Sequence, residues 1–276
     1  MAGWVLPHPS TQRNEDTPTQ NAPMRLALLN LLEEVGSLTS FSLRFTRNAL
    51  FPPYEFGQIR KHLDELGAKS FPLVGTTGLI MGLILALQSR PVLARFGAES
   101  FVPAMVSVSV VRELGPVITA LIVAGRVASG IGAELGSMRV TEQIDAMEVS
   151  GINPFKYLVV SRVIACMILL PLLTGIVDLL AILGAYIAMV IDVNISWRLY
   201  LHSVTSSIWM RDLLPSIAKT VVFGFLIGLV GTHQGYTTKG GTEGVGRAST
   251  TAVVISSLLI IFVDMVLVKL TVIIWG

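Results

Sequence analysis

Two adjacent charged residues, Arg112 and Glu113, lie inside a long apolar run of the sequence, directly before a Leu-Gly-Pro tripeptide. A charge in the middle of a membrane costs roughly 3 kcal/mol or more on insertion scales, so it needs a compensating environment. Adjacent residues of a helix point about 100° apart, so an ion pair between these two has poor geometry. We therefore expect each to face a different partner. Either they form a polar patch beside a substrate path, or they pair with another helix, for which Lys219 is a candidate.

Four charged residues elsewhere interrupt apolar runs, and these residues could have either a structural role or a role in ion-coupled transport. Pairing between helices or snorkelling to the interface would satisfy Asp178, Lys219, Asp264 and Lys269. In an ion-coupled secondary transporter, Glu113, Asp178 and Asp264 would instead be the proton or cation sites. Folds of that class often contain internal repeats, and no repeat is evident in this sequence.

Enzymatic chemistry has little support in the sequence. The four histidines are scattered over loops and segment ends, so they predict no metal site and no catalytic cluster (His8, His62, His202 and His233). The single cysteine, Cys166, lies in an apolar run and is expected to be a buried apolar residue. No GxxxxGK[ST] motif is present, so we expect no bound cofactor, and the energy must come from a partner or an ion gradient.

Residues 139–154 form a polar stretch with helical periodicity. Its apolar residues share one helical stripe, and its acidic residues occupy the other faces (Val140, Ile144 and Met147; Glu142, Asp145 and Glu148). Gly151 suits the position after a helix end, and Pro154 prevents continuation. The stretch predicts a short amphipathic helix between two spans, which is either a docking surface or a solvated loop helix.

The elements that position these residues are membrane helices. The chain of 276 residues is 52% hydrophobic and 14% charged, against about 25% charged in soluble domains. Its net charge of +2 is too weak a bias to predict nucleic-acid binding. About 20 apolar residues cross a bilayer, and five runs approach or exceed that length (71–87, 101–124, 157–191, 213–231 and 251–275). We predict an all-α integral membrane protein with five transmembrane helices.

The N-terminal region is expected to differ from the bundle. Residues 1–23 are polar and predict a disordered tail. Residues 24–49 are amphipathic and predict a helix at the membrane interface, within an elbow region, 24–69, that precedes a transmembrane bundle, 70–276. Loops are expected at 90–95 and, rich in Gly and Thr, at 232–250.

Lys and Arg residues favour one orientation. With the N-terminus inside, inside segments contain thirteen of them and outside loops contain four (Arg90, Arg95, Arg198 and Arg211). The N-terminal region supplies seven of the thirteen, and the remaining loops still favour the same side by six to four. The sequence therefore predicts an inside N-terminus and an outside C-terminus.

Four segments together resemble the MlaE/YrbE permease family: VRELGPV at 111–117, AGRVASG at 124–130, AELGSMRVTEQIDAME at 133–148 and GVGRASTT at 244–251. The similarity runs from about Gly57 to the C-terminus and does not include residues 1–23. This resemblance implies a permease subunit, not an enzyme, in the bacterial inner membrane. It would be a homodimer that moves phospholipid or a similar amphiphile, driven by two cytoplasmic ABC ATPase subunits and working with a periplasmic MCE-domain protein.

The resemblance also implies two sets of site residues. A lipid cavity at the dimer interface would involve the end of the first span and part of the second (Leu85, Val92, Leu93, Phe96, Arg112, Glu113 and Leu114). The family's coupling helix, which seats in a groove of the ATPase, matches residues 141–151 (Thr141, Glu142, Gln143, Ile144, Asp145, Met147, Glu148 and Gly151). The spacing of Gly75, Gly78 and Gly82, together with the family architecture, predicts a dimer seam near the first and fifth spans.

Overall fold

The computed structural model describes residues 22–52 and 55–275, and it divides the chain into two units, 1–41 and 42–276. Helix α1 (Ala22–Ala49) begins in the first unit and ends in the second. It confirms a helix over the predicted residues 24–49, whereas its place at a membrane interface stays a prediction. The predicted tail, residues 1–23, lies outside the described residues except for its last two, which are helical.

Five helical stretches of the described chain are long and apolar enough to cross a membrane, which confirms the predicted number. The first is α2 (Phe56–Ala94), and the fourth and fifth are α9 (Met210–Tyr236) and α10 (Gly241–Trp275). The second is composite: η1 (Glu99–Phe101), α3 (Val102–Ser109), η2 (Val110–Leu114), α4 (Gly115–Val123), η3 (Ala124–Ala128) and α5 (Ser129–Val140). The third joins η4 (Phe155–Val160) to α7 (Ser161–Val193).

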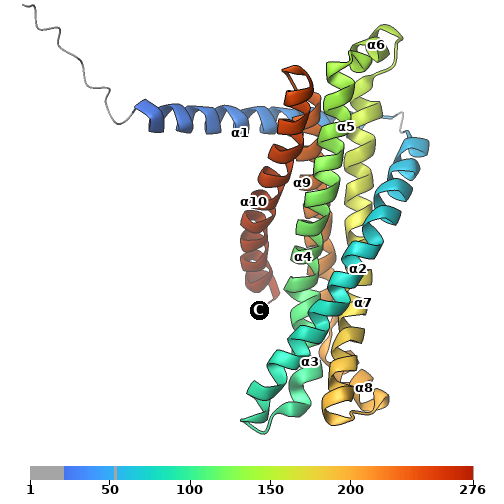
Figure 1. Cartoon of the computed structure of the whole chain (residues 1–276), viewed down its shortest axis with the longest axis vertical. Coiled ribbons are helices and arrows are strands. Elements are labelled where there is room, and N and C mark those ends of the chain that lie inside the picture. Colours follow the sequence, from blue (N-terminus) through green and yellow to red (C-terminus); the bar gives the residue numbers. More distant parts are fainter. Residues whose placement is uncertain (1–21, 53–54, 276) are drawn as a thin grey trace, which may run out of the picture. The chain divides into compact units, whose positions relative to one another are not determined.

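Two short helices lie between these stretches. Helix α6 (Gln143–Val149) joins the second to the third at one end of the bundle, and α8 (Trp197–Ser207) joins the third to the fourth at the other end (Figure 1). At the α8 end, Tyr186, Trp197 and Tyr200 form an aromatic cluster, in which the Tyr200 hydroxyl donates to the Ile182 carbonyl at 2.7 Å. This cluster fixes α8 against α7.

Two loops predicted from polar residues are wrong. The segment 90–95 is instead the last turn of α2, where Arg90 pairs with Asp192 of α7 at 2.9 Å. The segment 232–250 is almost entirely helical, because α9 continues to Tyr236 and α10 begins at Gly241. With 39 residues, α2 is about 58 Å long, much more than the roughly 30 Å of hydrocarbon. The first polar residues of these two segments therefore do not mark the ends of the helices.

Three segments, η2, η3 and η4, are π-helical, and the sequence analysis did not predict them. A π turn accommodates an extra residue within a helix and often occurs at functional sites. In η2 the Gly115 amide donates to the Val110 carbonyl five residues earlier. This wide turn contains Arg112 and Glu113.

Close packing of α2 on α7 accounts for the glycine spacing from which the dimer seam was predicted. A methyl group added at Gly82 would overlap with the Ala181 carbonyl, and one at Gly78 would lie 2.9 Å from the Val177 carbonyl oxygen. Gly184 of α7 leaves equivalent space for the backbone of α2. The small-residue spacing thus serves contact within one chain. It gives no support to a seam between two chains, and the homodimer itself stays a prediction.

Candidate functional site

Charged side chains of two elements, η2 and α9, converge on a cavity of about 310 Å³ that α10 also lines. Of the predicted site residues, Arg112 and Glu113 line it. The other lining residues come from α9 and α10 (Arg211, Asp212, Pro215, Ser216, Lys219, Val268, Thr271 and Val272). We call this space the charged cavity.

Arg112 is held by Asp212, which is buried at the start of α9. The Arg112 Nε donates to Asp212 Oδ1 at 2.7 Å, and Nη2 pairs with the same oxygen. The other oxygen, Oδ2, accepts the backbone N–H of Trp209 at 2.9 Å and thereby caps α9. Because half of the Arg112 side chain is exposed, its guanidinium can meet an anion in the cavity while Asp212 holds it in place.

Lys219 lies between two carboxylates. Its Nζ is 2.8 Å from Glu113 Oε2, 2.9 Å from Glu113 Oε1 and 3.3 Å from Asp264 Oδ1. The Lys219 side chain is 4% exposed, against 42% for Glu113 and 18% for Asp264. Arg112 and Glu113 thus face different partners, as predicted. The two alternatives, a polar patch and an ion pair with Lys219, do not exclude each other, because the ion pair itself is part of the polar lining of the cavity.

An apolar groove of about 290 Å³ adjoins the charged cavity between α9 and α10. The two spaces share Pro215, Lys219 and Thr271, and the rest of the groove is apolar (Leu214, Ala218, Val222, Leu267, Leu270 and Ile274). Lys219 of α9 was predicted as a partner, whereas Asp212 of the same helix was not. The signal was present, because Asp212 and Lys219 are seven residues apart, which places them on one helical face.

The remaining predicted lipid residues do not line the charged cavity. Leu85 and Leu93 are partly buried against the core at the α8 end. Val92 and Phe96 are exposed apolar side chains near the end of α2, and Leu114 is partly buried. The structure thus brings together two of the seven predicted residues, and lipid contact by any of the seven stays a prediction.

The predicted docking segment, 141–151, folds as α6 with its flanking turns. Ile144 is buried, and Met147 packs partly buried against the main core, as their shared stripe predicts. Gly151 adopts φ +77° and its amide donates to the Glu148 carbonyl, while the Ile152 amide donates to Met147. These bonds form a Schellman motif, so the prediction that Gly151 ends this helix is confirmed.

The rest of the segment faces outward. Its polar residues are exposed, and Asp145 pairs with Arg139 of α5 (Thr141, Glu142, Gln143, Asp145 and Glu148). Glu142 precedes the helix in a left-handed conformation, with φ 59°. Val149 is 91% exposed, and Ile152 is also exposed, although the predicted apolar stripe did not include them. Acidic and apolar side chains thus share one small exposed surface at this end of the bundle.

Carboxylates in the described residues form no metal site, since no group of three His, Cys, Asp or Glu side chains lies close enough together. Two of the three carboxylates proposed for ion coupling, Glu113 and Asp264, share Lys219 as their counter-charge. The third, Asp178, is buried beside Gly115, where an added methyl group would overlap with its carboxylate. The geometry therefore gives no particular support to an ion-coupled transporter.

Comparison with known proteins identifies the family of this chain. The family model "Permease MlaE" matches residues 59–270. A probable ABC transporter permease protein of Rickettsia bellii is 39% identical over 242 residues, which cover 88% of this chain and 93% of that protein. The intermembrane phospholipid transport system permease protein MlaE of Haemophilus influenzae is 33% identical, over 76% of this chain and 84% of that protein. The chloroplastic protein TRIGALACTOSYLDIACYLGLYCEROL 1 of Arabidopsis thaliana is 33% identical, over 75% and 59%.

The matched region includes all or most of each of the five apolar helices, the charged residues of η2 and the α6 segment. It also includes most of the lining of the charged cavity, from Arg112 to Val268. A family match of this extent covers most of the membrane domain and not one motif alone. This multi-pass membrane protein therefore belongs to the MlaE family of ABC transporter permeases.

Proposed function

We propose that this permease moves phospholipid, or an amphiphile of similar chemistry, between the bacterial inner membrane and a periplasmic MCE-domain protein. The observation that carries the proposal is the junction of the charged cavity with the apolar groove. An amphiphile needs both environments within the length of one molecule, and Pro215, Lys219 and Thr271 border both. The Haemophilus relative, named for intermembrane phospholipid transport, supports the same substrate class.

The charge of the cavity favours an anionic headgroup. Arg112, Arg211 and Lys219 contribute three positive charges to its lining, and Glu113 and Asp212 contribute two negative charges. Lys219 and Asp212 are buried and already paired, whereas Arg112 keeps an exposed edge. A phosphate oxygen would meet this edge through charge-assisted hydrogen bonds. Acyl chains would then lie along the apolar groove.

Energy for transport would come from two ABC ATPase subunits that bind α6. In the orientation that Lys and Arg residues favour, α6 lies inside and the charged cavity lies toward the outer side. The exposed surface of Glu142, Glu148 and Val149 supports the docking role. A homodimer would place two copies of this surface on two ATPase subunits.

Photo-crosslinking tests the substrate site. A photoreactive residue at position 113, in the complex that co-purifies with the tagged full chain, should capture phospholipid identified by mass spectrometry. The same residue at Ser137, an exposed position on α5, is the matched control and should not. Capture of protein alone at position 113 would contradict the proposed site.

Transport itself is tested in proteoliposomes that contain the purified complex. Transfer of a labelled phospholipid should require ATP, and Glu113→Gln should assemble normally but change the rate of transfer. Transfer driven equally well by an ion gradient without ATP would contradict the ABC mechanism.

A further inference from the structure

Helix α6 connects two helical segments, α5 before it and η4 with α7 after it, which we call the two legs of α6. The chain enters it from α5 and leaves it through η4 into α7, and both α5 and α7 pack on α9. A force applied to α6 therefore reaches the bundle through these two legs, in addition to the contact of Ile144 and Met147 with the main core. How the legs are connected to each other decides whether they move together.

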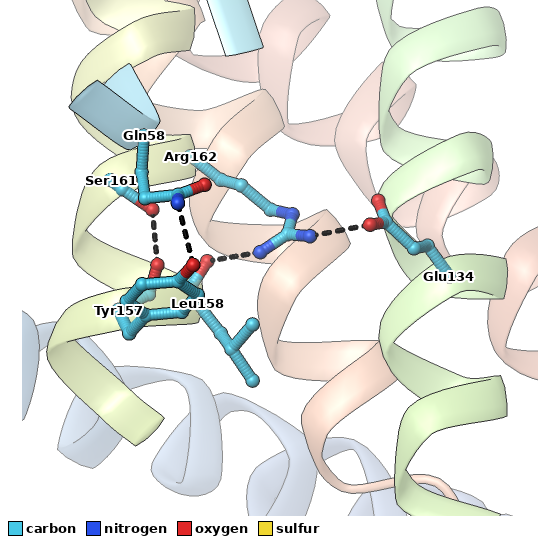
Figure 2. Close-up of polar contacts among 6 residues, drawn as sticks. All are labelled: Gln58, Glu134, Tyr157, Leu158, Ser161 and Arg162. Atoms are coloured by element: carbon cyan, nitrogen blue, oxygen red, sulfur yellow. Dashed lines mark hydrogen bonds and ion pairs between the residues drawn. The ribbon is translucent and has the colours of Figure 1, made fainter. Parts of the chain in front are cut away.

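One side chain, that of Arg162, joins the two legs directly. Arg162 lies in the first turn of α7, and its side chain is only 4% exposed. Its Nη1 donates to the Leu158 carbonyl in η4 at 2.9 Å, and its Nη2 donates to Glu134 Oε1 in α5 at 2.6 Å (Figure 2). The guanidinium thus bonds to both legs at once.

This guanidinium depends strongly on Glu134. An arginine stays charged in proteins, so burial cannot be relieved by loss of a proton. Its Nε has no hydrogen-bond partner within the part of the chain that the structure describes. Glu134 supplies the opposite charge that a buried cation needs.

The leg that contains Arg162 is firmly anchored elsewhere. In η4 the Tyr157 hydroxyl accepts a bond from Gln58 of α2 at 2.5 Å, and the Tyr157 carbonyl accepts one from Ser161 at 2.5 Å (Figure 2). Lys156 donates to the Phe51 carbonyl at 2.9 Å. Through the bonds of Tyr157 to Gln58 and of Lys156 to Phe51, η4 is attached to the start of α2 and to the residues just before it.

The other leg, α5, is solvent-exposed on the face that contains Glu134. The Glu134 side chain is 55% exposed. One turn earlier on the same face, a methyl group added at Gly130 would meet nothing within 4 Å. Side-chain packing on this face therefore constrains α5 little, although other faces of α5 pack on α9 and α10. The bond from Arg162 to Glu134 ties this face to the other leg.

We infer that Arg162 and Glu134 are a positioning pair that makes the two legs of α6 move as one unit, so that a displacement of α6 by its partner reaches the bundle. This inference rests on the proposed function. The pair does not touch the substrate or the ATPase. Its effect is on how much transport each cycle of hydrolysis produces.

The test is the ratio of phospholipid transferred to ATP hydrolysed, measured for the purified complex in proteoliposomes. Glu134→Gln keeps the side-chain volume but removes the charge, and it should lower this ratio at least fivefold while ATP hydrolysis stays within twofold of wild type. Glu134→Asp keeps the charge and should retain most of the ratio. The matched control is Glu243→Gln, which removes an exposed ion pair with Arg247 on α10 and should leave the ratio unchanged.

The outcomes separate this inference from the proposed function. If the wild-type complex transfers no phospholipid with ATP, the proposed function fails. If wild type transfers phospholipid and Glu134→Gln keeps its ratio, the positioning role is wrong. A merely structural role would reduce the yield of complex but leave the ratio unchanged. Failure of both Glu134 variants to assemble would equally overturn the inference, because the pair would then be needed only for folding.

Discussion

Lys219→Met is the most informative single change in the charged cavity. The wild-type ammonium is 2.8 Å from Glu113 and 3.3 Å from Asp264, and it is almost fully buried. Methionine fills a similar volume without charge, so the variant leaves two carboxylates facing each other. The destabilisation should therefore come from those carboxylates and not from lost packing.

The loss of stability in Lys219→Met depends on how exposed each of the two carboxylates is. Removing one partner of a buried ion pair costs about 3–5 kcal/mol, because the other charge is left uncompensated. Glu113 is 42% exposed, so solvent screens it and it contributes little. Asp264 is 18% exposed, so its unpaired carboxylate should account for most of the loss of folding free energy, about 2–4 kcal/mol.

Asp264→Asn should therefore have effects of opposite sign in two backgrounds. In wild type, Lys219 keeps its ion pair with Glu113, so Asp264→Asn should lower the stability by less than about 1 kcal/mol. In the Lys219→Met background the same change removes an unpaired carboxylate, so it should restore about half of the lost stability. The coupling between the two sites should be about 1–3 kcal/mol.

Thermal unfolding of the full chain in mild detergent, followed by the fluorescence of its four tryptophans, measures these differences. Lys269→Met is the matched control, because Lys269 is an exposed lysine on the same α10 helix as Asp264. It should leave the midpoint unchanged. If Asp264→Asn lowers the midpoint by the same amount in both backgrounds, the two sites are independent and the reasoning is refuted.

Three further predictions concern packing and docking. Gly82→Ala should cost at least about 1–3 kcal/mol, because its methyl group overlaps with a carbonyl of α7, whereas Gly57→Ala, with open space around it, should be neutral. Size-exclusion profiles of the two variants compare them, and equal behaviour would contradict the close packing. Glu142→Lys with Glu148→Lys should abolish stimulation of the partner ATPase without loss of folded permease, and unchanged stimulation would contradict docking by α6. Gly151→Ala should destabilise the end of α6 by about 1 kcal/mol, because its φ is +77°, and hydrogen exchange of the α6 amides should rise.

The sequence predicted features that depend on local or one-dimensional properties. Five apolar runs gave five membrane-spanning stretches, because hydropathy directly reports which residues a bilayer accepts. Gly151 was correctly placed after α6, since a Schellman motif needs only the residues around it. The family resemblance, confirmed by the comparisons, extended these local signals to a transport class.

Features that depend on neighbours were missed or placed wrongly. Arg90 and Pro91 suggested a loop, but the ion pair with Asp192 supports the last turn of α2. The glycines of the first span suggested contact between subunits, but α7 already occupies their face. Asp212 could not be assigned to Arg112 without knowing that α9 packs beside η2.

The π-helical turn at η2 has a consequence for how the second span tolerates changes in length. One residue added to an α-helix rotates everything beyond it by about 100°. In η2 the bond from Gly115 to Val110 absorbs one residue within a single wide turn, so the buried faces of α3 and α4 stay in phase. A second π-helical turn of this kind is present at η3. Loss of a single residue at either of these two turns should therefore convert it to an α turn without rotating the packed surface of the span.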